Sequence, residues 1–163
     1  LGHHLSIINA DRYELIFNNP HKHIRSTNDL QTWYTTKKIE NHEKTHINFV
    51  VFDSKLEAIE AQIINDSQHV KSFVKNDHLY FTIWYMWEGV PRRYFPDFII
   101  ELKNGKKMIL ETTGRDDEQN RVKRMALARW VDAVNQSGAF GMWSWDVSFH
   151  QDDLSEKLEK HGK

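Results

Sequence analysis

The sequence predicts a single domain of the α/β or α+β class, in which helices cover a mixed β-sheet. Three observations lead to this prediction. The chain has 163 residues, which is enough for one hydrophobic core. It is 39% hydrophobic and 28% charged, a balance typical of globular domains. From the first predicted helix onward, the elements follow in the order helix, three strands, helix, strand, so both kinds of element share one core.

The first half of the chain contains one clear strand and one clear helix. Residues 1–46 are polar and weakly patterned, so we expect irregular structure or short strands there. Residues 47–52 are rich in β-branched and aromatic side chains, which predicts a strand. Ser54 is a typical helix N-cap, and the helix extends to about residue 65. Its apolar face is predicted by residues spaced three and four apart, namely Leu56, Ile59 and Ile63.

The second half is rich in strands and ends in charged residues. In order, it predicts a short strand at 70–74, an aromatic strand at 79–87, a β-hairpin at 92–114, a helix that ends near residue 135 and a strand at 140–149. We find no internal repeat, low-complexity segment or linker. We therefore divide the chain into an irregular segment at 1–46, one domain at 47–150 and a charged tail or helix at 151–163, which we expect to be exposed.

The composition excludes several classes of protein. There are no cysteines, so disulfides and thiolate metal sites are impossible. No apolar run approaches the roughly 18 residues of a membrane span, and no signal-peptide pattern opens the chain. We therefore expect a cytoplasmic protein with no membrane partner. The chain opens with Leu1 rather than Met, which indicates a piece of a longer protein or an added tail.

Positive charge gathers in the middle of the chain. The net charge is −1, which gives no global argument for nucleic-acid binding. Residues 91–130, however, contain ten Lys/Arg and six Asp/Glu, a balance of +4 that leaves −5 for the remainder. A locally positive region on a nearly neutral protein fits an anionic partner. A solvated surface of mixed charge is the more common origin of such a pattern.

The loop of the predicted hairpin decides which residues share a face. Residues 103–105, Lys-Asn-Gly, suit a three-residue loop with Gly105 in the left-handed conformation. Leu102 then pairs with Lys106. A two-residue Asn-Gly turn would shift the register by one residue and move every second side chain to the other face.

In the three-residue register, Asp97 lies opposite Glu111, and Thr113 faces the same way. Two adjacent carboxylates repel each other unless a cation lies between them, and oxygen ligands of this kind suit Mg²⁺ or Mn²⁺. A helical glutamate can complete the site, either Glu57 at the edge of the apolar face or Glu60 within it. Two surface acids on a hairpin are the plainer explanation of the same pattern.

The sequence resembles a known family over about 100 residues. Pro96-Asp97, thirteen further residues and then Glu111-Thr112-Thr113-Gly114 are similar to the P-D…E-x-K nuclease motif without its lysine. More specifically, residues 48–147 resemble the C-terminal endonuclease domain of type III restriction enzymes, in the subunit that also carries the helicase motor. Further matching blocks occur in the family's order, at 53–57, 74–79, 94–98, Lys123 and 130–135.

The resemblance implies a restriction-endonuclease-like core that hydrolyses DNA phosphodiester bonds with Mg²⁺ or Mn²⁺. It assigns the metal to Asp97 and Glu111, with Glu57 at the matching position for a third acid and Glu60 ranked second. It also implies double-stranded DNA as a partner, with a helicase/ATPase motor and a modification subunit in the parent restriction–modification enzyme. This chain contains no G-x-x-x-x-G-K-[ST] motif and so carries no P-loop motor.

Thr113 stands where the family's motif has its lysine. In the family that lysine would orient the attacking water, help to deprotonate it and offset charge at the phosphate, whereas a threonine carries no cation. Either the lysine was changed deliberately to give an inactive protein, or it was lost in the lineage, or another base has taken over its role. The resemblance therefore implies that metal binding survives while cleavage is weak or absent. A nuclease-like domain that only binds DNA or docks to a subunit is the alternative function.

Other residues indicate nucleic-acid contacts or a different metal site. Trp87 and Tyr94 flank a turn near the acids and are candidate base contacts. Residues 42–46 match the H-E-x-x-H zinc motif but run into a predicted strand rather than a helix, so we expect no zinc protease. The candidate contacts to DNA phosphates are Arg92, Arg93, Lys107, Arg115 and Lys123.

Overall fold

The computed structural model of the chain describes residues 2–9, 12–17 and 26–163, with side chains described from residue 26 onward. Strands make up most of the elements, and three helices accompany them. In chain order the elements are β1 (Gly2–Asn9), β2 (Arg12–Phe17), the 3₁₀ helix η1 (Thr27–Asp29), β3 (Lys38–Glu40), β4 (Val50–Phe52), α1 (Lys55–Asp66), β5 (Val70–Lys75), β6 (Thr82–Trp87), β7 (Val90–Tyr94), β8 (Phe98–Leu102), β9 (Lys107–Thr112), α2 (Glu118–Ser137), β10 (Trp143–Ser148) and α3 (Gln151–Gly162).

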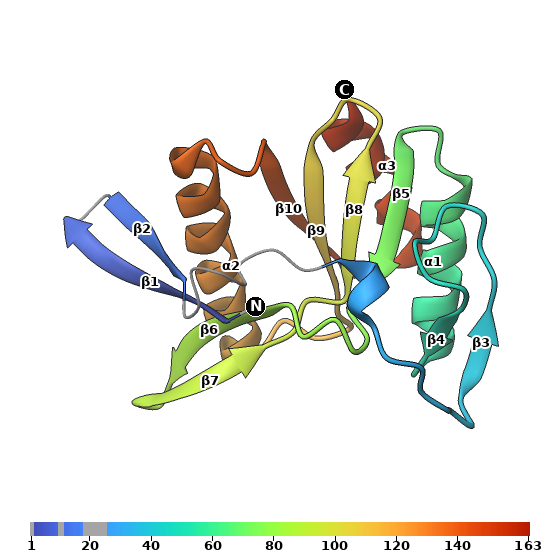
Figure 1. The fold of residues 1–163 in the computed structure, drawn as a ribbon, viewed down its shortest axis with the longest axis horizontal. Helices are drawn as coiled ribbons and strands as arrows, with labels where there is room; N and C mark the ends of the chain where they lie inside the picture. The colour runs from blue at the N-terminus through green and yellow to red at the C-terminus, as the bar shows by residue number, and fades with distance from the viewer. Residues whose placement is uncertain (1, 10–11, 18–25) are drawn as a thin grey trace.

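A four-stranded mixed sheet in the order β10-β9-β8-β5 lies at the centre of the fold (Figure 1). β10 runs parallel to β9, whereas β9 with β8 and β8 with β5 are antiparallel pairs. A second sheet has the order β2-β1-β6-β7, and β3 pairs with β4. The predicted combination of helices with a mixed sheet is therefore confirmed.

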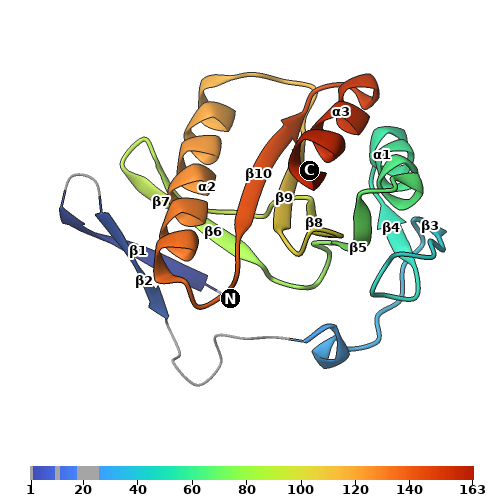
Figure 2. The ribbon, with the colours of Figure 1, turned by 90° about the horizontal axis from the view of Figure 1, so that it is seen from above.

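Hydrophobic side chains pack on both faces of the central sheet, and Figure 2 shows α1 and α2 on opposite sides of it. On one face, Ile100 and Leu110 join a core formed with α1 and α3. On the other face, Ile109 joins a core formed with α2, β6 and Tyr94 of β7. Neighbouring residues of a strand point to opposite faces, so Leu110 and Ile109 belong to different cores. The alternation fixes the face on which each later residue of β9 lies.

Helix α1 begins where the sequence predicts. The Ser54 hydroxyl accepts a hydrogen bond from the Glu57 amide at 3.2 Å, which satisfies one of the free N–H groups of the first turn. The predicted apolar face is wrong in part, because Ile59 is 44% exposed. The buried residues of the helix are instead Glu60, Ala61 and Ile64. The helix is thus rotated relative to the prediction, and the rotation takes a carboxylate into the interior.

The C-terminal helix α3 is not an exposed tail, so this prediction is wrong. Leu154 and Leu158 are both 0% exposed and belong to the same core as α1. Two leucines four residues apart lie on one face of a helix, which is sufficient to bury that face. Close packing continues to Gly162, where an added Cβ would meet the His69 Cβ at 2.5 Å.

Of the described helices, none is long and apolar enough to cross a membrane.

The predicted loop and register of the hairpin are confirmed. Gly105 has φ +85° and its amide donates to the Leu102 carbonyl at 3.0 Å. The Leu102 amide donates to the Lys106 carbonyl at 2.9 Å, and Phe98 lies opposite Leu110. The left-handed conformation favours glycine, because a side chain there is strained.

The first strand of the hairpin is shorter than predicted. Tyr94 ends β7, which belongs to the second sheet, where it lies opposite Ile83 of β6. β8 begins only at Phe98. Pro96 between them is buried and has no N–H to donate to a ladder. The prediction of one hairpin over 92–114 is therefore wrong at its start, and Arg92 and Arg93 lie in a different sheet from the acids.

Candidate functional site

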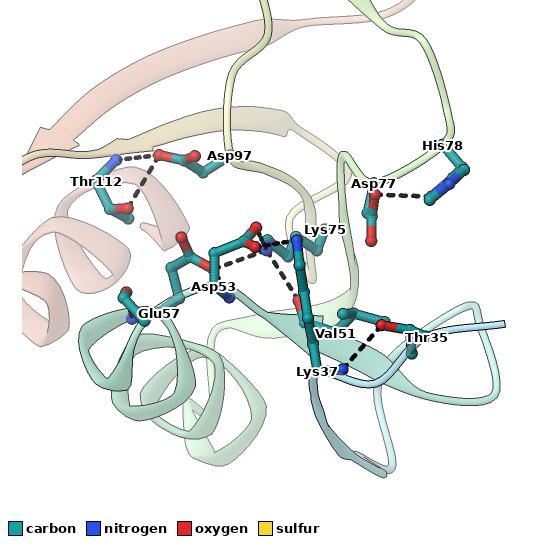
Figure 3. A network of polar contacts seen from close by, with 11 residues as sticks. Thr35, Lys37, Val51, Asp53, Glu57, Lys75, Asp77, His78, Asp97 and Thr112 are labelled. Carbon is teal, nitrogen blue, oxygen red and sulfur yellow. Dashed lines mark hydrogen bonds and ion pairs between the residues drawn. The ribbon is translucent and has the colours of Figure 1, made fainter.

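The paired carboxylates lie at the end of the hairpin away from its loop. Continuing the pairing of Phe98 with Leu110 by one residue places Asp97 opposite Glu111. Asp97 Oδ2 accepts hydrogen bonds from the Thr112 amide at 2.8 Å and the Thr112 hydroxyl at 2.9 Å (Figure 3). Glu111 Oε2 accepts a hydrogen bond from the Tyr94 hydroxyl at 2.6 Å. The fold thus brings the two acids of the motif together and holds each from a neighbouring strand.

Both acids lack enough positive charge to stay fully ionised. Burial, followed by the charge of Asp97, raises the pKa of Glu111 to about 8, although the Tyr94 hydroxyl and the Lys123 charge act in the opposite direction. Burial also raises the pKa of Asp97, despite its two hydrogen bonds from Thr112. The pKa of Tyr94 is raised as well, first by burial and then by the charge of Glu111. The pair therefore holds protons at pH values where exposed carboxylates are ionised.

Glu60 is a third carboxylate near Asp97. It is 0% exposed, and neither side-chain oxygen makes a hydrogen bond of good geometry to a described residue. Burial raises its pKa to about 7, while the nearby hydroxyls of Ser148 and Thr112 lower it and the charge of Asp97 raises it. A buried carboxyl without full hydrogen bonding is costly, so this residue calls for an explanation beyond packing.

Glu57 is held differently, although it lies on the same helix. Its Oε2 is 2.7 Å from Lys75 Nζ and accepts a hydrogen bond from the Asp53 amide at 3.0 Å. Lys75 is only 6% exposed, and its ammonium also contacts the Val51 carbonyl at 2.8 Å and Asp53 Oδ2 at 3.3 Å (Figure 3). A second ion pair joins Asp53 to Lys37. The Asp53–Glu57 pair therefore has its cations within the chain.

The structure separates the candidate metal ligands into different surroundings. Glu111 belongs to the α2 face, where Tyr94 and Lys123 approach it. Glu60 belongs to the α1 face with Thr112 and Ser148. Asp97 influences both, since its charge raises the pKa of each. Within residues 26–163, no three His, Cys, Asp or Glu side chains come close enough together to form a metal cluster.

Two carboxylates fit a magnesium ion even without a third. Mg²⁺ is commonly held by one or two carboxylates, with water or substrate phosphate as its other ligands. Asp97 and Glu111 supply oxygen donors only, are half-buried and carry raised pKa values. A divalent cation is the group that would restore their ionisation. The donor set therefore fits Mg²⁺ or Mn²⁺, and Glu60 rather than the lysine-bound Glu57 is the carboxylate left without a counter-ion.

Thr113 is half-buried and bonded within its own loop. Its hydroxyl donates to the Arg115 carbonyl at 3.0 Å and accepts from the Arg115 amide at 3.2 Å, while its amide donates to Ser148 at 3.0 Å. Two lysines lie near the acids instead. Lys75 lowers the pKa of Asp97. Lys123 Nζ lies 5.9 Å from the Tyr94 ring centroid and 3.1 Å from Asn120 Oδ1.

The predicted DNA contacts do not all lie at the acids. Arg92, Arg93 and Arg115 are exposed, as a phosphate contact requires. Lys107 is at the loop end of β9, remote along the strand from Glu111, and its Nζ donates to the Phe140 carbonyl at 3.2 Å. Tyr94 is 4% exposed and bonded to Glu111, so it is a support for the acid and not the predicted base contact.

The H-E-x-x-H segment is not helical. Residues 42–46 contain turns and a single β-bridge, from Thr45 to Phe73, and no helix. His42 is 5% exposed and packs edge-on against Phe52 and Phe73. The motif requires both histidines on one helical face, and residues 42–46 do not provide such a face.

Sequence reasoning missed two residues that shape the site. Lys75 lies one residue beyond the strand predicted at 70–74, yet it ends β5 and its charge is buried against Glu57. Tyr94 was read as a surface aromatic. The residues next to Lys75 and Tyr94 in the sequence do not indicate these roles, because each role depends on a partner from a distant segment. Only the odd position of a lysine at the end of the run Val70–Lys75 gave a weak signal.

Comparison of the chain with family models, with curated proteins and with solved structures gives no match. The resemblance noted from the motif blocks contributes an expectation, and the geometry supplies the distances and charges that bear on it.

Proposed function

We propose that this chain is a restriction-endonuclease-like domain that hydrolyses DNA phosphodiester bonds with Mg²⁺ or Mn²⁺, weakly because of Thr113. The observation that carries the proposal is the juxtaposition of Asp97 and Glu111, half-buried on facing positions of a hairpin with raised pKa values. Strongly perturbed carboxyl groups that lie together are more frequent at functional sites than elsewhere. The order of the motif blocks supports the same assignment.

Each residue would have a limited part in this chemistry. Asp97 and Glu111 would hold the metal, with Glu60 as the next carboxylate available and Glu57 retained by Lys75. The metal would polarise the phosphate and lower the pKa of a bound water. Thr112 fixes Asp97 by two hydrogen bonds, and Tyr94 fixes Glu111 by one. Exposed Arg92, Arg93 and Arg115 would contact phosphates of double-stranded DNA.

Thr113 would limit the rate because it brings no positive charge to the reacting phosphate. Its hydroxyl is engaged by Arg115, so it is also poorly placed to act as a base. A positioned proton acceptor typically contributes 10²- to 10⁴-fold to a rate. The loss of a lysine here would therefore reduce cleavage strongly and leave the metal ligands in place.

The test compares plasmid cleavage with Mg²⁺ by the natural chain and by the Thr113→Lys variant. We expect the variant to be faster by about 10²-fold, and Asp97→Asn in either background to remove cleavage. Asp132→Asn, an exposed carboxylate on α2, is the matched control and should change nothing. Equal and robust cleavage by both chains would show that Thr113 is not the limiting residue.

A second candidate function is a nuclease-like domain that binds DNA or docks to the motor and modification subunits without cleaving. The observation that favours it is the absence of a cation at Thr113, together with carboxyls that retain protons near neutral pH. Mn²⁺ binding followed by electron paramagnetic resonance separates the two. Asp97→Ala should abolish Mn²⁺ binding by a nuclease, whereas a docking module would keep its affinity for DNA or its subunit.

A further inference from the structure

A cavity of about 480 Å³ lies under the segment between η1 and β4. Its wall includes Trp33 and Tyr34 from the stretch before β3, Phe49 from the stretch before β4, and Val51 of β4. This volume is within the range of about 300–1,000 Å³ that small-molecule sites occupy. It is separate from the carboxylates, and nothing in the proposed hydrolysis makes use of it.

The described lining of the cavity is aromatic and amide-rich and carries no Asp, Glu, Lys or Arg. The side-chain amides of Asn28, Gln31 and Asn48 have no hydrogen-bond partner among the described residues, so each keeps a carbonyl acceptor and an NH₂ donor for a ligand. The lining also includes His46, so a cation would find no counter-ion there and an anion would depend on protonation of that one histidine. An uncharged ring with both donors and acceptors at its edge fits this lining.

Large apolar side chains are exposed at this cavity. Tyr34 is 97% exposed, Phe49 47% and Ile39 44%, so three of the ten exposed large hydrophobic residues of the described chain line one cavity. A cluster of exposed apolar side chains indicates an interaction surface more often than a single exposed apolar residue does. Trp33 is already stacked, with its ring centroid 4.4 Å from that of His78 and an interplanar angle of 21°.

Two residues connect the cavity to segments that contact the acids. Val51 lines it, and the Val51 carbonyl accepts the hydrogen bond from Lys75. His78, on which Trp33 stacks, follows Asn76, whose amide donates to the Asp97 carbonyl at 2.8 Å. Figure 3 shows Val51 and His78 in the same view as Asp97.

We propose that this cavity binds a nucleobase by stacking on its aromatic side chains and by hydrogen bonds to its free amides. The assignment of the base to a nucleic-acid strand rests on the proposed function, which supplies a DNA duplex, so a base must leave its pair and its stack before it enters the cavity. A free nucleoside presents the same ring and the same edges. Base–aromatic stacking tolerates any base, so the cavity should show little preference among the four.

The test uses a single-stranded octadeoxynucleotide with a central 2-aminopurine, whose fluorescence is quenched by stacking, titrated in EDTA so that no metal or cleavage is involved. Tyr34→Ala should raise Kd by about fivefold or more. Tyr34→Phe keeps the ring and should bind like the natural chain. Because Tyr34 is almost fully exposed, neither variant threatens folding. An octanucleotide with an abasic site at that position should bind weakly to all three chains.

The outcomes decide between the sources of the base and separate this inference from the nuclease proposal. Unchanged affinity in Tyr34→Ala, equal binding of the abasic strand, or no binding of either probe overturns the cavity assignment. Equal affinity for free 2-aminopurine deoxyriboside overturns the strand as the source. Asp97→Ala should bind the octanucleotide normally in EDTA while losing Mn²⁺, so failure of the metal site leaves this result unaffected.

Discussion

Two pairs of acids lie within this small domain, and their surroundings differ. Asp53 and Glu57 are close to Lys75 and Lys37, and the pKa of Asp53 is lowered, first by its hydrogen bond from Lys37. Asp97 and Glu111 accept hydrogen bonds from neutral donors and form no ion pair with a described residue, and both pKa values are raised although Lys75 and Lys123 act in the opposite direction. Residue type is the same in the two pairs, so the pKa difference between Asp53 and the second pair comes from burial, which is the first cause at Asp97 and Glu111, and from the position of the cations.

The Asp53–Glu57 pair forms ion pairs within the chain, whereas the Asp97–Glu111 pair could still bind a cation. A buried carboxylate requires a counter-charge, or it keeps a proton. The first pair obtains that charge from the chain itself and so gains nothing from a metal. The second would obtain it only from a bound cation. Glu60, on the opposite face of the sheet from Glu111, resembles the second pair in this respect.

The largest expected effect comes from removing the cation of the first pair. Lys75→Met leaves Glu57 buried without its partner, which should lower the free energy of unfolding by about 3–5 kcal/mol. Lys71→Met is the matched control on the same strand, because Lys71 is exposed and its ion pair with Glu101 should contribute less than about 1 kcal/mol. Urea denaturation of both variants measures the difference, and equal losses would contradict the structural role of Lys75.

A second prediction concerns Glu60 and pH. The folded chain binds this proton more tightly than the unfolded chain, since the pKa rises from 4.5 to about 7 on folding. The resulting stabilisation is complete below about pH 4.5 and is lost as the pH rises through about 7. At roughly 1.4 kcal/mol per pKa unit, the loss is of the order of 3 kcal/mol.

Glu60→Gln removes the titrating group and keeps its shape. The difference in unfolding free energy between the natural chain and the variant, followed from pH 4.5 to 8.5, should shift in favour of the variant as the pH increases. Any constant cost of the amide cancels in this difference. A difference independent of pH would show that Glu60 does not titrate as described.

The third prediction is for metal binding to the second pair. A metal at Glu111 must displace the proton held there, because the pKa of Glu111 is about 8. Mn²⁺ affinity should therefore increase about tenfold for one unit of pH between 6.5 and 7.5, by the competition of one proton with the metal. Isothermal titration at the two pH values measures it, and an affinity that does not change with pH would place the metal elsewhere.

The smallest effect is expected at Tyr94, whose hydroxyl donates to Glu111. Tyr94→Phe should cost about 1–2 kcal/mol of stability, and more at pH 9 than at pH 6, because the bond favours the ionised carboxyl. Tyr85→Phe is the matched control, since the Tyr85 hydroxyl accepts from Gln119 at 2.8 Å and no charge is involved. Its cost should be similar at both pH values. Identical pH dependence in the two variants would contradict the role given to Tyr94.

The hairpin could be predicted from the sequence because its determinants are local. Gly105 after Lys103-Asn104 sets the loop, the loop sets the register, and the register sets Asp97 opposite Glu111. The fold class followed from the patterning of strands and helices for a similar reason. Both depend on neighbours in the chain, and single-sequence patterns report those well.

The surroundings of the acids could not be predicted, because distant segments supply them. The face of α1 was misassigned since a carboxylate, Glu60, occupies a position that the pattern reserves for apolar residues. The burial of α3 was missed because charged residues outnumber its two leucines. The ion pair of Glu57 with Lys75 joins a helix to a strand end, and no spacing along the chain encodes it.

The packing of α3 also has a mechanical meaning. Leu154 and Leu158 fasten this helix to the core, and Gly162 fits against His69 with no room for a side chain. Any polypeptide attached beyond this helix would be coupled to the sheet through a rigid lever. A displacement of α3 would therefore disturb its packing on α1 and its contact with β10, the strand beside β9.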